Sequence, residues 1–177
     1  DGGAIFTNDD QLAIKMKSIR VHGSGQDKYD NVRIGINGRL DTFQAAVILE
    51  KLKIFDDEIH SRNKIAEVYS RKLTRKVIKP YIPINYMSSW AQYSIICDNK
   101  SMRDRIVKSL SDNKIPSMIY YRIPLHLQKV FKYLEYNIND FSISENISNK
   151  IFSLPMHPYL TRTDQNRIIE TLNSIFK

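Results

Sequence analysis

A long run of regularly spaced apolar residues near the middle of the chain sets the strongest limit on its fold. From Phe43 to Leu73 these residues recur at intervals of three and four. This spacing predicts an amphipathic helix, with a bend near 60–61. Asp41 or Thr42 can cap its start, and prolines follow its end. We expect the boundary between two domains to lie within this helix.

The segments on either side alternate between strand and helix patterns. The short apolar run 4–6 precedes polar residues that can cap a helix over 12–19. After the long helix the expected elements are, in order, a strand over 91–97, a helix capped by Ser101 and stopped at 112–113, a strand over 117–121, and helices over 144–152 and 163–176. This alternation predicts a compact α/β domain in the second half of the chain.

Residues 20–39 show no periodicity and contain four of the six glycines of the chain. Loops of this length inside compact domains are usually functional or disordered. Asn37 and Arg39 stand on either side of Gly38, just before the long helix. Their amide and guanidinium groups can both reach an anion, and Arg offers bidentate geometry to a phosphate or a carboxylate. The alternative is a loop in which these side chains bind backbone carbonyls.

A second candidate site follows the expected strand over 117–121. Residues 120–126 are Tyr-Tyr-Arg-Ile-Pro-Leu-His, and their phenol, guanidinium and imidazole groups can hydrogen-bond a ligand rich in hydroxyl groups. The alternative is that alternate side chains point into the core, with the polar ends of Tyr and His satisfied locally. His157 lies between two prolines in a rigid turn, and we expect it to be structural.

Several classes of function lack support in the sequence. The net charge of +8 and the pI of about 9.5 favour anionic partners. The cations are spread along the chain, however, and the cluster at 71–79 is interpreted as a solvated helix end. RNA-binding aromatic motifs are absent, so nucleic acid is not an expected partner. The sequence has no phosphate-binding loop, no Gly-x-Ser-x-Gly turn and no zinc spacing of His and Cys, so no metal site is expected.

We expect a cytoplasmic protein without membrane segments. No apolar run approaches the ~20 residues that span a bilayer, and the first residues do not form a signal peptide. Cys97 is the only cysteine, which excludes an internal disulfide. The chain begins Asp-Gly-Gly-Ala-Ile-Phe, without Met and as if inside a strand. We therefore expect its numbering to start within a longer polypeptide.

Four short motifs occur in order along nearly the whole chain. They are Asp-Gly-Gly-Ala-Ile-Phe-Thr-Asn-Asp at 1–9, Gly-Ile-Asn-Gly-Arg-Leu-Asp-Thr-Phe-Gln-Ala-Ala at 35–46, Ile-Pro-Leu-His-Leu-Gln at 123–128 and Ser-Leu-Pro-Met-His-Pro-Tyr-Leu at 153–160. Together they resemble the DegT/DnrJ/EryC1/StrS family of pyridoxal-phosphate-dependent sugar aminotransferases. The stretch 33–59 is most similar to enzymes that aminate carbon 3 of a UDP-linked 3-oxo-N-acetylglucosaminuronic acid.

The resemblance implies an α/β fold, the C-terminal part of an aspartate-aminotransferase-like (fold type I) enzyme. Residues 1–50 would complete the large cofactor-binding domain and begin the connecting helix, and 51–177 would form a small mixed α/β domain. Family members are homodimers whose active sites are shared between subunits. The lysine that holds pyridoxal 5'-phosphate would lie upstream of Asp1. No catalytic residue is therefore expected in this chain, and the chain alone is expected to be inactive.

The resemblance also implies binding residues. Asn37 matches the asparagine that reaches the cofactor phosphate of the other subunit, and Arg39 is its expected companion. The residues expected to bind the nucleotide sugar are His22, Lys28, Tyr29, Tyr120, Tyr121 and His126. The sequence departs at 120–122 from the enzymes that aminate carbon 3, which often have His-Tyr-Pro where this chain has Tyr-Tyr-Arg. This departure bears on which sugar is used, and not on the class of reaction.

The implied activity is a two-stage transamination. An amino donor, typically glutamate, gives its nitrogen to the cofactor, and a UDP- or dTDP-linked ketosugar takes it. Such amino sugars are precursors of surface polysaccharides and other glycans. Amination at carbon 4 in place of carbon 3 stays open. The alternatives are a non-catalytic homologue that binds or regulates, and a basic nucleic-acid-binding domain, which the dispersed charge disfavours.

Overall fold

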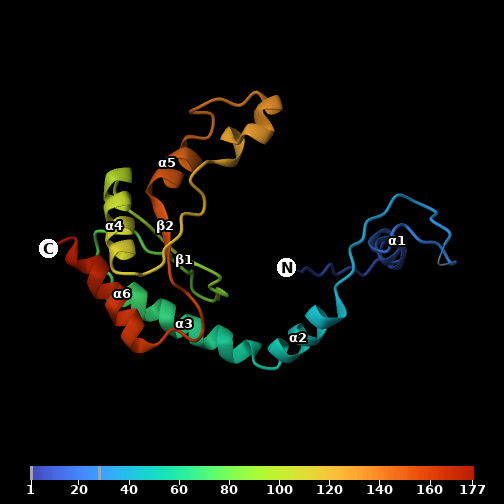
Figure 1. Cartoon of the computed structure of the whole chain (residues 1–177), viewed down its shortest axis with the longest axis horizontal. Coiled ribbons are helices and arrows are strands. Elements are labelled where there is room, and N and C mark those ends of the chain that lie inside the picture. The colour runs from blue at the N-terminus through green and yellow to red at the C-terminus, as the bar shows by residue number, and fades with distance from the viewer. Residues whose placement is uncertain (1, 28) are drawn as a thin grey trace. The chain divides into compact units, whose positions relative to one another are not determined.

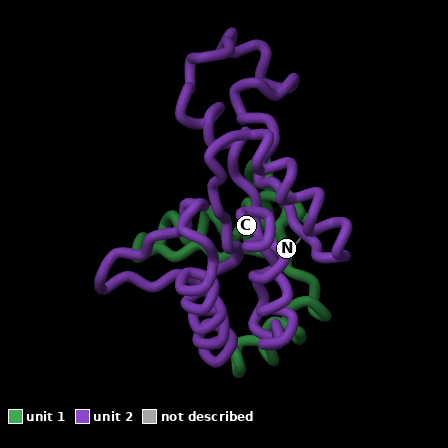
Figure 2. Tube along the Cα trace, turned by 90° about the vertical axis from the view of Figure 1, so that its left-hand side faces the viewer, with its two compact units in different colours: residues 1–54 green, residues 55–177 purple. Residues whose placement is uncertain are grey.

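The computed structural model describes residues 2–27 and 29–177. The chain divides into two compact units, residues 1–54 and residues 55–177, here called unit 1 and unit 2 (Figure 2). Each unit has its own set of elements, and each is described by itself. Among the described residues, no helix is both long enough and apolar enough to cross a membrane.

Unit 1 contains two helices joined by the glycine-rich loop. Helix α1 (Asp10–Arg20; Figure 1) is capped by Asp9, whose carboxylate accepts a hydrogen bond from the backbone N–H of Leu12 at 3.0 Å. Helix α2 (Thr42–Leu52) begins at Asp41, whose carboxylate accepts from the N–H of Phe43 at 2.8 Å. Both caps satisfy N–H groups that a helix start leaves unpaired. The structure thus confirms the helix predicted over 12–19 and Asp41 as a cap.

The predicted strand over 4–6 is wrong for the described residues, because its backbone pairs with no other segment. The side chains of Ile5 and Phe6 are 77% and 91% exposed. A strand exists only when its N–H and C=O groups bond a neighbouring strand. An apolar run shows that its residues are suited to a strand. It does not show whether a second strand lies beside it to pair with its backbone.

The predicted long helix is two helices, α2 and α3 (Phe55–Lys72). The break lies at 53–54 and not at 60–61. There the N–H groups of Lys53 and Ile54 bond the carbonyls of Glu50 and Lys51, three residues back, each at 3.2 Å. This tighter turn ends α2. Periodicity alone misses the break because apolar residues continue on both sides of it.

Unit 2 is a small α/β domain built around an antiparallel pair of strands. After α3 its elements are β1 (Tyr93–Ile96), α4 (Lys100–Asp112), the short helices η1 (Leu125–Leu127) and η2 (Lys129–Leu134), α5 (Ser142–Lys150), β2 (Ile151–Leu154) and α6 (Arg162–Ser174). Strands β1 and β2 pair with Tyr93 opposite Leu154 and Ile95 opposite Phe152. Single bridges from Ile78 to β1 and from Met118 to β2 widen the sheet at both edges.

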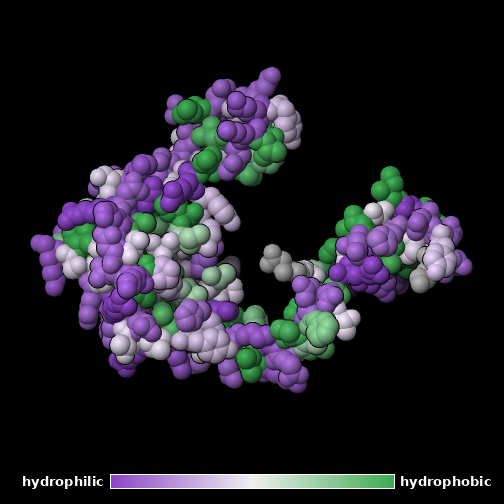
Figure 3. Space-filling view, viewed as in Figure 1, coloured by the Kyte–Doolittle hydropathy of each residue, from purple (hydrophilic) through white to green (hydrophobic). Residues whose placement is uncertain are grey.

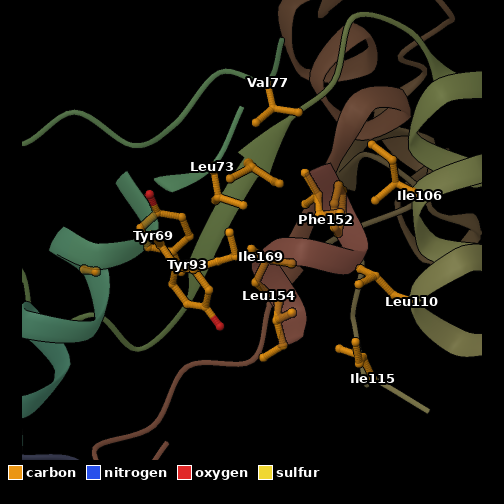
Figure 4. Close-up of a cluster of buried hydrophobic side chains, with 14 of the residues drawn as sticks. Tyr69, Leu73, Val77, Tyr93, Ile106, Leu110, Ile115, Phe152, Leu154 and Ile169 are labelled. Atoms are coloured by element: carbon orange, nitrogen blue, oxygen red, sulfur yellow. The ribbon is translucent and has the colours of Figure 1, made fainter. Parts of the chain in front are cut away.

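The core of unit 2 lies between this sheet and helices α3, α4 and α6 (Figure 4). Helical spacing of four places Ile106 and Leu110 of α4 on one buried face, and both are fully buried with Phe152 of β2. Two buried phenols are satisfied: Tyr69 donates to the carbonyl of Pro155 at 3.0 Å, and the hydroxyl of Tyr93 lies 2.8 Å from that of Ser70. Burial raises the pKa of Tyr69, which therefore stays neutral.

Three predicted boundaries in unit 2 need correction. The helix expected over 144–152 ends at Lys150, and the apolar residues after it form β2, because they pair with β1 and bury Phe152. Helix α4 is capped by Asn99, which accepts from the N–H of Met102 at 2.9 Å, and not by Ser101. The strand expected over 117–121 is reduced to one bridge at Met118.

Many large apolar side chains of both units are exposed (Figure 3). On α2, Phe43, Val47 and Leu49 are 86%, 62% and 62% exposed. In unit 2 the segment after the second candidate site exposes Val130 and Ile138, each at 70%. Several large apolar side chains exposed on one helix, as on α2, are typical of an interface with another protein surface.

Cys97, at the end of β1, is expected to be inert toward thiol reagents in the folded protein. Its side chain is 1% exposed, and burial raises the pKa of its thiol to about 11. Because the ordinary pKa of a cysteine thiol is 9.0, this rise leaves about a hundredfold less thiolate near neutral pH. A chromogenic disulfide reagent at pH 8 should react only after urea is added. Rapid reaction without urea would contradict the buried position.

Candidate functional site

The loop between α1 and α2 is folded back against the end of α1. The N–H of Ile36 donates to the carbonyl of Ile19 at 2.8 Å, and the N–H of His22 donates to the carbonyl of Ile36 at 2.9 Å. The N–H of Gly38 donates to the carbonyl of Arg20 at 2.8 Å. Residues 20–39 are therefore a long loop, as predicted, but one whose second half is fixed by backbone pairing.

Two glycines make this pairing possible. At Gly35 a Cβ atom would lie 2.0 Å from the backbone nitrogen of Gly23 and 2.7 Å from the carbonyl oxygen of Ile19. Gly23 has a φ of +75°, and a Cβ there would lie 1.8 Å from the carbonyl oxygen of Arg33. Neither position has room for a side chain. Close backbone approach at these glycines thus places Asn37 beside the end of α1.

Asn37 and Arg39 bind each other and keep hydrogen-bond donors free. The Nε of Arg39 donates to the Oδ1 of Asn37 at 3.0 Å, and both residues are exposed. Neither side chain bonds a backbone carbonyl of the described residues, so the alternative of a purely tied-down loop is not observed. The bond occupies the one acceptor of Asn37. Its amide nitrogen and both Nη groups of Arg39 remain as donors, an arrangement suited to an oxyanion such as phosphate.

The other predicted residues of unit 1 lie in the same loop. His22 is exposed, with a φ of +59°, and follows Val21, which pairs with Asn37 in an antiparallel bridge. Tyr29 is 84% exposed, and its N–H donates to the carboxylate of Asp27 at 2.8 Å. Lys28 lies outside the described residues. The loop thus brings His22 and Asn37 together through the backbone, and Tyr29 lies in its outer bend.

In unit 2, Tyr120 and Tyr121 form an edge-to-face pair with ring centroids 5.4 Å apart. Both line a groove of about 640 Å³, here called the tyrosine groove, which also includes Gln128, Ser144 and Ser148. Tyr121 is 71% exposed. Phenol, amide and hydroxyl groups beside apolar walls suit a sugar, whose faces are apolar and whose edges carry hydroxyl groups.

His126 has a different environment. Its Nε2 lies 3.1 Å from the Oε1 of Glu145, and the two side chains are only 8% and 14% exposed. Its ring packs on Phe141 with centroids 4.7 Å apart. His126 also lines an apolar cavity of about 310 Å³ next to the tyrosine groove. This geometry favours the alternative stated above for this segment, in which the polar end of the His is satisfied locally.

Glu145 is the residue of this region that the sequence analysis did not single out. Besides His126, its carboxylate accepts from the N–H of Asn139 at 2.8 Å and from the N–H of Phe141 at 3.4 Å. It thereby fixes the turn that precedes α5. An acidic residue in the first turn of a helix is the signal that could have identified it, because such residues bond the unpaired N–H groups there.

The sequence is similar to a family of known proteins. The model of the DegT/DnrJ/EryC1/StrS aminotransferase family matches residues 1–173. The chain is 40% identical over 161 residues to the UDP-2-acetamido-2-deoxy-3-oxo-D-glucuronate aminotransferase of Pseudomonas aeruginosa, covering 90% of this chain and 43% of that protein. It is 36% identical over 181 residues to a pleiotropic regulatory protein of Geobacillus stearothermophilus, covering 100% of this chain and 48% of that protein.

A solved structure has the same fold. The crystal structure of a DegT DnrJ EryC1 StrS aminotransferase from Brucella abortus superposes with a TM-score of 0.88 at 47% identity, covering 96% of this chain and 45% of the other. The chain therefore spans about half the length of these relatives.

Proposed function

The chain belongs to the DegT/DnrJ/EryC1/StrS aminotransferase family, and it has the α/β fold of the C-terminal part of fold type I enzymes. From this premise we propose that it forms the C-terminal portion of a pyridoxal-phosphate-dependent aminotransferase. The enzyme transfers an amino group to a nucleotide-linked ketosugar. The chain covers less than half of the matched relatives, and we propose that the cofactor lysine lies upstream of Asp1.

The observation that carries this proposal is the Asn37–Arg39 pair. Its remaining hydrogen-bond donors, without a carboxylate bonded to either side chain among the described residues, fit the phosphate group of pyridoxal phosphate. Bound pyridoxal phosphate would supply the electron sink for transamination. Asn37 and Arg39 would hold its phosphate end in place. In a homodimer with shared sites they would serve the partner subunit, and the exposed apolar face of α2 supports such an association.

The tyrosine groove supports a sugar as the amino acceptor. Tyr120 and Tyr121 would orient the sugar ring through hydroxyl hydrogen bonds, and the loop residues His22, Lys28 and Tyr29 would approach the nucleotide. We propose a UDP- or dTDP-linked ketosugar as the substrate and glutamate as the amino donor, in a cytoplasmic route to polysaccharide or glycan precursors. For His126 we propose that it holds the segment that carries the tyrosines, through its contact with Glu145.

The test is amino transfer by the full-length protein. Borohydride treatment with pyridoxal phosphate should fix the cofactor to the protein, seen as a mass increase. Glutamate with a UDP- or dTDP-linked 3-ketosugar should then yield 2-oxoglutarate. The 177-residue chain alone should give neither result.

Cofactor binding without turnover would favour the second candidate, a non-catalytic regulator. The similarity to a pleiotropic regulatory protein supports that candidate. Failure of both cofactor trapping and turnover in the full-length protein would overturn the enzyme proposal. Turnover by the isolated chain would overturn the placement of the lysine upstream.

A further inference from the structure

Unit 2 has a second groove, separate from the tyrosine groove and lined mainly by charged side chains. It lies along α4, encloses about 560 Å³, and is here called the α4 groove. Its charged and amide side chains belong to Lys100, Arg103, Asp104, Lys108, Arg122 and Asn149, with Asp112 at one end. Four cations against two carboxylates leave a net charge of +2 in this groove.

Arg103 is the unusual member of this set, because its side chain is only 5% exposed. Its Nε donates to the Oδ1 of Asp104 at 2.6 Å, and its Nη1 donates to the carbonyl of Ile151 at 3.5 Å. A guanidinium has five N–H donors, so Nη2 keeps both of its own. No buried side-chain nitrogen or oxygen of the described residues lacks a partner. The Nη2 group is therefore accessible at the surface, and Arg103 is one of the residues that line the α4 groove.

The two carboxylates of the groove pair with three of its four cations, and Asp112 accepts a hydrogen bond from Lys108 at 2.9 Å. Asp104 is shared, since its Oδ2 accepts from Lys100 at 2.9 Å while Oδ1 accepts from Arg103. The hydrogen bond from Lys100, and then that from Arg103, lowers the pKa of Asp104. Arg122 forms no hydrogen bond or ion pair with any described residue. The groove thus contains a nearly buried guanidinium with free donors and an arginine without a partner among the described residues, an arrangement suited to an oxyanion.

Arg122 also connects this groove to the proposed sugar site. Tyr120 and Tyr121 line the tyrosine groove, whereas the next residue, Arg122, lines the α4 groove. An anion bound by Arg122 would therefore hold the backbone that carries both tyrosines from its other side. Arg122 stands where the sequence departs from the His-Tyr-Pro pattern.

We propose that the α4 groove binds a phosphate-type oxyanion through Arg103, Arg122 and Lys100. The ligand is either free phosphate or the phosphate monoester of a small molecule. The net charge of +2 and the volume of about 560 Å³ suit a small dianion. The proposal does not depend on the aminotransferase activity.

The test is calorimetric titration of the full-length protein, loaded with pyridoxal phosphate so that the cofactor phosphate site is filled. Inorganic phosphate and ribose 5-phosphate are titrated separately. Removing one charge-assisted hydrogen bond costs about 1.5–3 kcal/mol, so Arg122→Gln and Lys100→Gln should each weaken binding by about tenfold or more. Arg105→Gln is the matched control on α4, because Arg105 is exposed and lies outside the groove lining.

A further variant tests the geometry of the donors. Arg103→Lys keeps the charge but lacks the forked N–H donors of a guanidinium, so it should weaken binding. Tighter binding of ribose 5-phosphate than of phosphate identifies a monoester as the ligand, and the reverse identifies free phosphate. Equal binding in Arg122→Gln, or no binding at millimolar phosphate, would each overturn the proposal.

Discussion

Replacing Gly35 by alanine is expected to disrupt the loop that carries Asn37 and, with it, retention of the cofactor. The new Cβ would lie 2.0 Å from the backbone nitrogen of Gly23 and 2.4 Å from the carbonyl carbon of His22. These are backbone atoms and cannot rotate away as the end of a side chain can. Overpacking typically costs about 1–3 kcal/mol, and contact with rigid backbone atoms puts this change at the upper end of that range. The pairing of Ile36 with Ile19 and His22 should then be lost.

The measurement is the urea midpoint of the full-length protein, together with the amount of pyridoxal phosphate that stays bound after dialysis. Asn31→Ala, at an exposed position of the same loop, is the control. Gly35→Ala should lower the midpoint and release the cofactor, whereas Asn31→Ala should do neither. Full cofactor retention in Gly35→Ala would show that the loop does not position the phosphate contacts.

The sequence predicts the helices of this chain well where caps and periodicity agree. At α1, Asp9 provides a cap oxygen, and α6 begins after Thr161, whose hydroxyl accepts from the N–H of Asp164. Both signals are local, so they act whatever the rest of the chain does. The same reasoning fails at β2, because apolar residues directly after α5 fit the end of a helix as well as a strand. Pairing of Phe152 opposite Ile95 decides between them, and this contact is not local.

Candidate site residues are predictable by type, but their environments are not. The sequence places Asn37 and Arg39 together, since they are two residues apart, and the structure adds that they bond each other. It gives no sign that His126 is buried, because its partner Glu145 lies nineteen residues along the chain. The sequence also does not predict that the Nη2 donors of Arg103 stay free. Which of its N–H groups are bonded depends on the distant carbonyl of Ile151 and on the packing around α4.

Asn37→Ala is expected to weaken binding of pyridoxal phosphate strongly without unfolding the loop. The side chain of Asn37 is exposed, and its only hydrogen bond to a described side chain is the one from Arg39. The loop should therefore stay folded through its backbone pairs. Loss of a hydrogen bond to a charged phosphate costs about 1.5–3 kcal/mol, which corresponds to a ten- to hundredfold rise in the dissociation constant.

Asn37→Asp distinguishes charge from shape at the same position. A carboxylate has nearly the size of the amide but repels a phosphate and offers it no donor, so the loss should exceed that of Asn37→Ala. Asn31→Ala, in the same exposed loop, is the control and should bind the cofactor as the unchanged protein does. Fluorescence titration with pyridoxal phosphate provides the dissociation constants. If Asn37→Asp bound as tightly as the unchanged protein, the donors of Asn37 would not face a phosphate, and the Asn37–Arg39 pair would no longer support the proposed cofactor site.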